Sequence, residues 1–237
     1  MPDGARNIVG LEPDTAYSQT RARVEDYFDR SATKTWERLT SDAPVSRIRQ
    51  TVREGRDGMR ALMLSCLPED LSGRRVLDAG CGAGQMTAEL AARGAEVVAI
   101  DISPSLVDIA RKRMPREYLS QVEFTSGDML SSRLGAFDHV IAMDSLIYYT
   151  AADIVDALDG LLARTSGSIV FTVAPRTPLL MAMWYAGKLF PRSDRSPTMI
   201  PHALTGLHKA AHAGIDIRSA GRISRGFYIS EAMEVRA

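Results

Sequence analysis

The chain has 237 residues, with 29 basic and 29 acidic side chains and therefore no formal net charge. A chain of this length can bury a full hydrophobic core as one domain, without disulfides or metals to hold it together. The zero net charge argues against a general nucleic-acid binder, which carries a basic excess. With 45% hydrophobic and 24% charged residues, the composition also excludes disorder of the whole chain.

The cysteines and the apolar segments indicate where the protein works. Cys66 and Cys81 cannot build a disulfide framework, and this usage fits a reducing cytoplasm. The first residues lack the apolar core of a signal peptide, and no run of about 18 apolar residues predicts a membrane span. The apolar run at 179–190 is shorter and contains Lys188, so it could lie on a membrane surface. We expect a cytoplasmic protein, with peripheral contact to the inner face of a membrane as an open alternative.

Residues 1–70 have the pattern of a helical N-terminal extension. Val24, Tyr27 and Phe28 follow helical spacing, and apolar residues recur with the same period between positions 48 and 63. In the second region, 71–237, short apolar strands alternate with amphipathic helices. This alternation predicts an α/β fold with a mainly parallel sheet and helices on both faces. The expected strands are 75–79, 96–100, 121–125, 137–143 and 168–173, and the expected helices are 84–93, 104–114 and 151–163.

Two of these helices carry start signals. Ser103-Pro104 supplies a cap and a proline at the first helical position, and Thr150 with Asp153 can form a capping box. After Pro175 the alternation stops, and the prolines and apolar run of 176–200 predict a lid insertion. A helix at 201–213 and strands at 215–221 and 226–235 are expected to complete the chain.

The most informative stretch is the glycine-rich turn after the first strand, at 76–85. It contains Gly80, Gly82 and Gly84, which let the loop turn sharply and let a ligand approach its backbone. A dinucleotide fingerprint would need glycine at position 85, where this chain has glutamine. Asp78 stands two residues before the first glycine, where a carboxylate would repel a pyrophosphate but suits an ammonium group.

Acidic residues also follow the next two strands. Asp101 ends the second strand, where a carboxylate accepts hydrogen bonds from ribose hydroxyls. After the third strand, Asp128 could meet the amino group of an adenine, and Met129 could pack on its ring. Together these features describe a nucleoside that carries an amino acid instead of phosphates, which is S-adenosylmethionine. A nicotinamide or flavin enzyme, or a βαβ protein with incidental glycines, remains an alternative.

This arrangement resembles the class I methyltransferase family, a Rossmann-like fold, over roughly residues 70–175. The resemblance extends the expected donor site to Ile102, after the second strand, and Met143, at the end of the fourth. The turn at 143–149 lacks the Asp/Asn-Pro-Pro-Phe/Tyr motif of base N-methyltransferases. A small-molecule acceptor is therefore expected, and no nucleic acid.

The flanking segments at 27–39, 51–56, 144–149 and 171–175 resemble the magnesium-protoporphyrin O-methyltransferases. The resemblance implies methyl transfer to one propionate of magnesium protoporphyrin IX in chlorophyll or bacteriochlorophyll biosynthesis, and contact with the magnesium chelatase that supplies this substrate. Two alternatives stay open: another O-methyltransferase, for example one acting on a quinone precursor, and a non-catalytic binding module. Cyanobacterial and plant relatives tend to carry histidine where this chain has Tyr148.

The same resemblance suggests roles for individual side chains. Tyr27 would close over the donor and orient the substrate, and Tyr148 would line the acceptor pocket. Arg53 would pair with the carboxylate of the donor. A propionate with a pKa of about 4.3 is already ionised near neutral pH, so no general base is required. His208 and His212 lack a third ligand nearby, so no protein-bound metal is expected.

Overall fold

The computed structural model describes residues 16–28, 47–178, 180–182, 185 and 197–236. Its main helices are α1 (Ala16–Tyr27), α3 (Arg47–Ser65), α4 (Gln85–Ala92), α5 (Pro104–Arg113), α6 (Ala151–Leu162) and α8 (Leu204–Ala210). Its strands are β1 (Arg75–Ala79), β2 (Glu96–Asp101), β3 (Val122–Ser126), β4 (Phe137–Ala142), β5 (Thr165–Pro175), β6 (Pro201–His202), β7 (Arg218–Arg225) and β8 (Tyr228–Arg236). Short 3-10 helices occupy Arg116–Gln121 and Ser132–Leu134.

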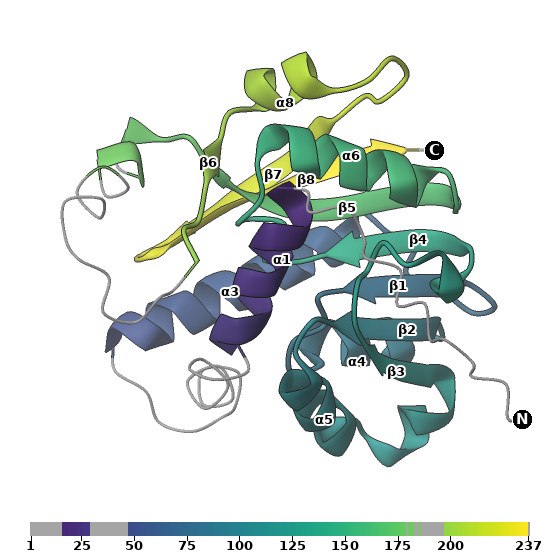
Figure 1. Ribbon diagram of the computed structural model, residues 1–237. Coiled ribbons are helices and arrows are strands. Elements are labelled where there is room, and N and C mark those ends of the chain that lie inside the picture. Colours follow the sequence, from purple (N-terminus) through teal and green to yellow (C-terminus); the bar gives the residue numbers. More distant parts are fainter. Residues whose placement is uncertain (1–15, 29–46, 179, 183–184, 186–196, 237) are drawn as a thin grey trace, which may run out of the picture.

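The described strands form one sheet in the order β3-β2-β1-β4-β5-β8-β7, with β6 paired to β5. The five strands from β3 to β5 are parallel, whereas β8 runs antiparallel to β5 and β7 antiparallel to β8 (Figure 1). From β1 the chain adds β2 and β3 towards one edge of the sheet, and it then returns to the other side of β1 and adds β4 and β5 towards the opposite edge. The strand order thus reverses between β1 and β4. Ligands of open α/β sheets bind at such a switch point, beyond the carboxyl ends of the strands.

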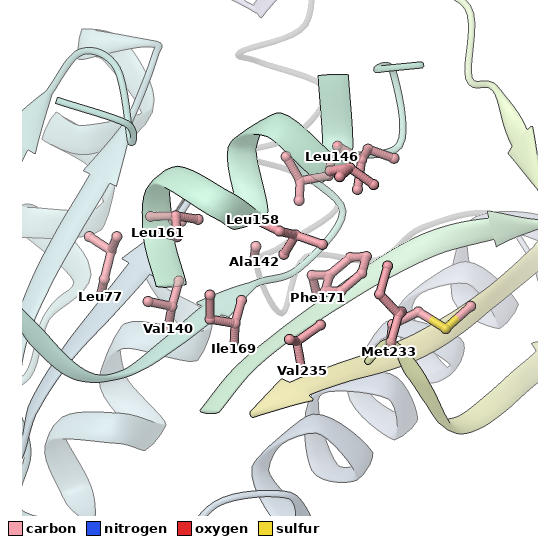
Figure 2. Packing of buried hydrophobic residues seen from close by; sticks show 14 of the residues in the cluster. Leu77, Val140, Ala142, Leu146, Leu158, Leu161, Ile169, Phe171, Met233 and Val235 are labelled. Carbon is pink, nitrogen blue, oxygen red and sulfur yellow. The ribbon is translucent and has the colours of Figure 1, made fainter. Parts of the chain in front are cut away.

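Helices cover both faces of the sheet, and each face has its own hydrophobic cluster. The cluster between the sheet and α6 includes Leu77, Val140, Leu158, Leu161, Ile169 and Phe171 (Figure 2). The cluster on the other face, under α3 and α4, includes Met59, Met63, Val76, Leu90, Ile141 and Val170. Consecutive residues such as Val76 and Leu77 fall into different clusters, because successive side chains of a strand point to opposite faces. Burial on both faces explains the continuous apolar runs of these strands.

The predicted parallel core is confirmed, and so are the two helix starts. Ser103 caps α5 by accepting a hydrogen bond from the N–H of Leu106, with Pro104 following it. Thr150 and Asp153 form the expected capping box at the start of α6. Both helices therefore begin where local side chains satisfy their first N–H groups.

Three elements after β4 begin or end three or more residues away from the predicted positions. β5 begins at Thr165, because polar residues ahead of the apolar run still pair with β4. The helix expected at 201–213 covers only 204–210, because residues 201–202 pair with β5 as a short strand. The strand expected at 215–221 runs from 218 to 225, in register with β8.

The lid predicted at 176–200 falls largely outside the described residues, which omit 179, 183–184 and 186–196. The division of the chain at residue 70 stays a prediction. Among the helices that the structure describes, none is long and apolar enough to cross a membrane.

Candidate functional site

The carboxyl ends of β1, β2 and β3 meet at one edge of the sheet. The strand register places Ala79 beside Ile100, and Asp101 beside Ser126. The loop after β1 is fastened at this edge, because the N–H groups of Gly80 and Cys81 donate to the carbonyl oxygen of Ile100 at 2.8 and 2.9 Å. The motifs that follow three separate strands are thereby brought together.

The three glycines of this loop differ in what surrounds them, although all have positive φ angles. A Cβ atom on Gly80 would lie 2.5 Å from the Cβ of Ser145, and one on Gly84 would lie 2.9 Å from the Cβ of Ala110. A Cβ atom on Gly82 would meet nothing within 4 Å. Gly80 and Gly84 are thus needed for close packing, whereas Gly82 leaves room above the loop.

Two carboxylates lie next to the loop: Asp101 is bonded to the loop itself, and Asp78 is bonded to α4, which follows it. The Oδ2 atom of Asp101 accepts a hydrogen bond from the N–H of Gly82 at 2.8 Å, and its Oδ1 atom accepts one from the N–H of Ser103 at 2.9 Å. Asp78 is fully buried and accepts a hydrogen bond from the hydroxyl of Thr87 at 2.6 Å. Burial, and to a lesser degree the charge of Asp101, raises the pKa of Asp78 to about 7. A cation placed beside this carboxyl would favour its ionised form.

Helix α1 is tied to the end of β3 by polar contacts. Asp128 accepts a hydrogen bond from the Tyr17 hydroxyl at 2.9 Å and forms an ion pair with Arg21 at 2.5 Å. The ring of Tyr17 stacks on Tyr149, with 4.9 Å between the ring centroids. Burial raises the pKa of Tyr17, so its hydroxyl stays protonated and continues to donate. Asp128, which is predicted to meet the amino group of an adenine, therefore also holds α1 against the end of β3.

An aromatic group lies between α1 and the turn after β4. Phe28 meets the edge of Tyr148 at a centroid distance of 6.4 Å, and Tyr27 meets Phe28 at 5.3 Å. Burial raises the pKa of Tyr148, with a further contribution from the charge of Asp144, so its hydroxyl is neutral near pH 7.

A second buried network fixes the start of that turn. Arg56 of α3 forms an ion pair with Asp144 at 2.6 Å, and their side chains are only 16% and 10% exposed. The hydroxyl of Tyr228 donates to Asp144 at 3.1 Å, and the N–H of Asp144 donates to Thr172 at 2.7 Å. Asp144 is the one non-glycine residue with positive φ in the described part of the chain. Strain of this kind is found where a site holds a side chain in a required position.

These elements surround one cavity of about 1030 Å³, including its open mouth. Most of the residues predicted to bind ligands line it, namely Asp78, Gly80, Gly82, Asp101, Ile102, Asp128, Met129, Met143 and Tyr148. Three predicted residues, Gly84, Tyr27 and Arg53, are not among the described residues that line it.

Sequence reasoning missed several side chains of this cavity: Tyr17, Arg21, Arg56, Arg60, Asp144, Ser145 and Tyr149. The spacing of Arg53, Arg56 and Arg60 indicates an arginine-bearing face of α3, although only Arg53 was predicted to bind a ligand. Nothing local could have indicated Tyr17 and Arg21, because their partner Asp128 lies more than 100 residues away.

The two histidines at helical spacing, His208 and His212, contact other residues of the chain. His212 contacts Asp159 of α6, and His208 contacts the carbonyl oxygen of Ile217 at 2.5 Å. Among the described residues, no group of three His, Cys, Asp or Glu side chains is arranged to hold a metal ion.

Comparison with known proteins identifies the family. A family model described as the C-terminus of magnesium-protoporphyrin IX methyltransferase matches residues 142–237, and a general methyltransferase-domain model matches residues 76–165. The magnesium-protoporphyrin O-methyltransferase of Rhodobacter capsulatus is 61% identical over 221 residues, which cover 93% of this chain and 98% of the relative. The chain belongs to the magnesium-protoporphyrin O-methyltransferase family.

Solved structures agree with this assignment. The crystal structure of magnesium protoporphyrin IX methyltransferase from Synechocystis PCC 6803 with bound SAH matches with a TM-score of 0.76 and 28% identity. The match covers 91% of this chain and 99% of that one. The class I methyltransferase fold is therefore confirmed, and this member of the magnesium-protoporphyrin O-methyltransferase family is an S-adenosylmethionine-dependent O-methyltransferase.

A second family shares only part of this likeness. The ubiquinone biosynthesis O-methyltransferase of Xanthomonas oryzae is 33% identical over 131 residues, which cover 52% of this chain and 54% of that relative. The match with this relative thus covers about half of each chain.

Proposed function

We propose that the chain transfers a methyl group from S-adenosylmethionine to a propionate carboxylate of magnesium protoporphyrin IX, giving the monomethyl ester in (bacterio)chlorophyll biosynthesis. The observation that carries the proposal is the composition of the cavity. Its described lining includes arginines but no histidine. Its aspartates are hydrogen-bonded or ion-paired: Asp78 with Thr87, Asp101 with loop N–H groups, Asp128 with α1 and Asp144 with Arg56. A described lining that has no histidine to act as a base, and whose aspartates are all bonded, suits an acceptor that is already an anion and has no proton to lose.

The half of the cavity over β1, β2 and β3 fits the donor. We assign Asp78 to its ammonium group and Asp101 to the ribose hydroxyls. Ile102 and Met129 offer apolar contacts for the adenine, and Gly82 leaves space for the chain between them. The hydroxyl of Ser145 lines the same cavity, is buried, and has no hydrogen-bond partner among the described residues. A polar ligand would satisfy it.

Arg60 is the better candidate for the donor carboxylate. It lines the cavity, whereas Arg53 does not, and it approaches Asp57 at 2.7 Å on its own helix. Its side chain is 14% exposed, so a carboxylate bound to it would be shielded from water. We therefore assign to Arg60 the role that was predicted for Arg53.

The reaction needs placement more than proton transfer. S-adenosylmethionine supplies an electrophilic methyl group when it is bound. The residues of this chain hold the acceptor carboxylate in line with that group and exclude water, and orientation of this kind can lower a barrier by roughly 7–11 kcal/mol. Tyr148 lines the acceptor side of the cavity. Tyr27 is not among the described lining residues, but its ring contacts Phe28, and the ring of Phe28 contacts Tyr148. We assign to both tyrosines the task of orienting the acceptor.

A quinone precursor is the second candidate acceptor, because the partial relative from Xanthomonas oryzae is named a ubiquinone biosynthesis O-methyltransferase. A phenol has a pKa near 10 and must lose its proton for methylation. The described lining of the cavity offers no histidine for that task. The carboxylate acceptor is therefore preferred.

The surroundings of the enzyme are proposed from its substrate. Magnesium chelatase makes the acceptor and is the expected protein partner. In the predicted lid, the described residues Tyr185 and Met199 are 57% and 43% exposed. Two single side chains do not make an apolar patch, so contact of the lid with the macrocycle or with the surface of a membrane stays a prediction.

Mass spectrometry of the reaction products tests the proposed function. The protein and S-adenosylmethionine are incubated in parallel with magnesium protoporphyrin IX, metal-free protoporphyrin IX and a phenolic quinone precursor. We expect one added methyl group on the magnesium porphyrin, released as methanol in mild alkali because it is an ester. A methyl group that resists alkali, or that appears only on the phenol, would refute the proposal.

A further inference from the structure

The ion pair between Arg56 and Asp144 faces the cavity but is fixed from outside it. Asp144 and Arg56 both line the cavity, whereas Tyr228 and Thr172, which bond to Asp144, are not among the described lining residues. Gly55, next to Arg56, allows this packing, because a Cβ atom there would lie 2.7 Å from the ring of Tyr228. Asp144 is therefore held by groups that no ligand in the cavity needs to touch, and Asp144 in turn holds the guanidinium of Arg56.

The position of this pair separates it from the donor groups. Asp78, Asp101 and Asp128 follow β1, β2 and β3, on one side of the switch point. Asp144 follows β4, Thr172 belongs to β5 and Tyr228 to β8, which all lie on the other side. An adenosine held by Asp101 and Asp128 leaves the side that carries Arg56 to the acceptor.

The charges also suit an anion that must react. A guanidinium has five N–H donors, so Arg56 can hold Asp144 and a second carboxylate at the same time. Paired with Asp144, it presents directed N–H groups without a net positive charge. A carboxylate bound there is oriented, but it is not neutralised as it would be by an isolated cation, and so it keeps its nucleophilicity.

We infer that Arg56 is the residue that binds the reacting carboxylate of the acceptor, and that Asp144 and Tyr228 are positioning residues that hold Arg56 in place. The inference rests on the proposed function and deepens it. The neutral ester that forms cannot make the same charge-assisted contact, so it binds Arg56 more weakly than the acid does.

The test measures two constants for each variant: KM for magnesium protoporphyrin IX and Kd for S-adenosylhomocysteine. In Arg56→Gln we expect KM for the porphyrin to rise about 10- to 100-fold, the size of a lost charge-assisted hydrogen bond, with Kd within about twofold. Arg56→Lys keeps the charge but not the planar fork, and we expect it to restore part of the loss. Arg60→Gln should show the reverse pattern, with Kd raised and KM for the porphyrin nearly unchanged.

Arg225→Gln is the matched control. Arg225 of β7 pairs with Glu54, which lies on the same helix as Arg56, and its side chain is 66% exposed. The variant therefore removes an equal charge without altering the described lining of the cavity. Both constants should stay within about twofold of the parent. An equal rise of KM in this variant would mean that overall charge, rather than Arg56 itself, attracts the acceptor, and would overturn the inference.

Binding of the acid and of its dimethyl ester gives a second readout. The parent should prefer the diacid by at least about tenfold, and Arg56→Gln should lose most of that preference. If Arg56→Gln unfolds because Asp144 is left buried without its partner, the double variant Arg56→Gln with Asp144→Asn removes both charges and is measured instead. An unchanged preference for the diacid, or a change in Kd for S-adenosylhomocysteine alone, would overturn the inference. A parent that forms no ester at all would instead refute the proposed function.

Discussion

The two halves of the cavity are built in different ways. The donor half is made of backbone loops that directly follow β1, β2 and β3, and its key contact, from Gly82 to Asp101, spans 19 residues. The acceptor half joins distant parts of the chain: Arg56 and Asp144 are 88 residues apart, and Asp144 and Tyr228 are 84 apart. The loops of the donor half thus depend mainly on local conformation, with Tyr17 and Arg21 as distant partners of Asp128, whereas the acceptor half depends on tertiary packing. A substitution in one half should change binding of one ligand and leave the other nearly unaffected.

The largest effect is expected from Gly82→Val, which should weaken S-adenosylhomocysteine binding by more than about 100-fold. The new side chain would occupy the space above the loop and would also be strained at a φ of 52°. Gly73→Val is the control, because Gly73 has a φ of 72° and a Cβ atom there would also meet nothing within 4 Å, but Gly73 does not line the cavity. Calorimetry checks both variants. Equal losses in the two would show that strain alone, and not contact with the donor, causes the effect.

Asp78→Asn comes next, with an expected loss of donor affinity of about 10- to 100-fold. Because the pKa of Asp78 is raised to about 7, the parent should also bind the donor more weakly as the pH falls below 7 and the carboxyl becomes protonated. The asparagine variant should lack this pH dependence. A parent whose donor affinity is constant from pH 5 to pH 8 would contradict the role of Asp78.

The same carboxyl affects the stability of the ligand-free protein. Between its ordinary pKa of 3.8 and about 7, the folded protein keeps a proton that the unfolded chain has lost. Rising pH therefore favours the unfolded state in this window, and the contribution levels off above pH 7. Denaturant unfolding should show the free energy of unfolding of the parent falling relative to Asp78→Asn as the pH rises from about 4 to about 7.

A smaller effect is expected from Tyr27→Phe, which should lower kcat and kcat/KM together by about tenfold and leave the Kd for S-adenosylhomocysteine unchanged. Because Tyr27 does not line the cavity, its effect is expected through Phe28 and Tyr148, and a poorer placement of the acceptor in the transition state has this signature. Steady-state kinetics with the porphyrin checks it. Unchanged kinetics would leave Tyr27 as a packing partner of Phe28.

The smallest effect is expected from Tyr228→Phe. The ring that packs on Gly55 is kept, and only the hydroxyl that donates to Asp144 is lost. KM for the porphyrin should rise by about two- to fivefold through poorer positioning of Arg56, with no change for the donor. An effect on the Kd for S-adenosylhomocysteine instead would place Tyr228 and Asp144 in the donor half.

The contrast between the halves also explains what the sequence could predict. Asp78, Gly82 and Asp101 stand at fixed distances from apolar strands, so their meeting at the sheet edge follows from the parallel topology. Tyr17 and Arg21 lie on a weakly amphipathic helix, and only tertiary structure brings them to Asp128.

Arg53 illustrates the limit for helices. The sequence shows three arginines on one face of α3, but not which part of the helix lies beside the sheet edge. Met59 and Met63 pack against the sheet, Arg56 and Arg60 line the cavity, and Arg53 lies two turns before Arg60, outside the described lining. In the same way, pairing of 201–202 with β5 could not be read from a pattern that favoured a helix.

The most direct test of a cavity divided between donor and acceptor is the crystal structure of the protein with S-adenosylhomocysteine and magnesium protoporphyrin IX bound together. We expect the adenosine beside Asp101, the amino group of the donor product on Asp78, and a propionate of the porphyrin on Arg56. A structure in which Arg56 instead binds the carboxylate of S-adenosylhomocysteine, with both propionates elsewhere, would contradict the account.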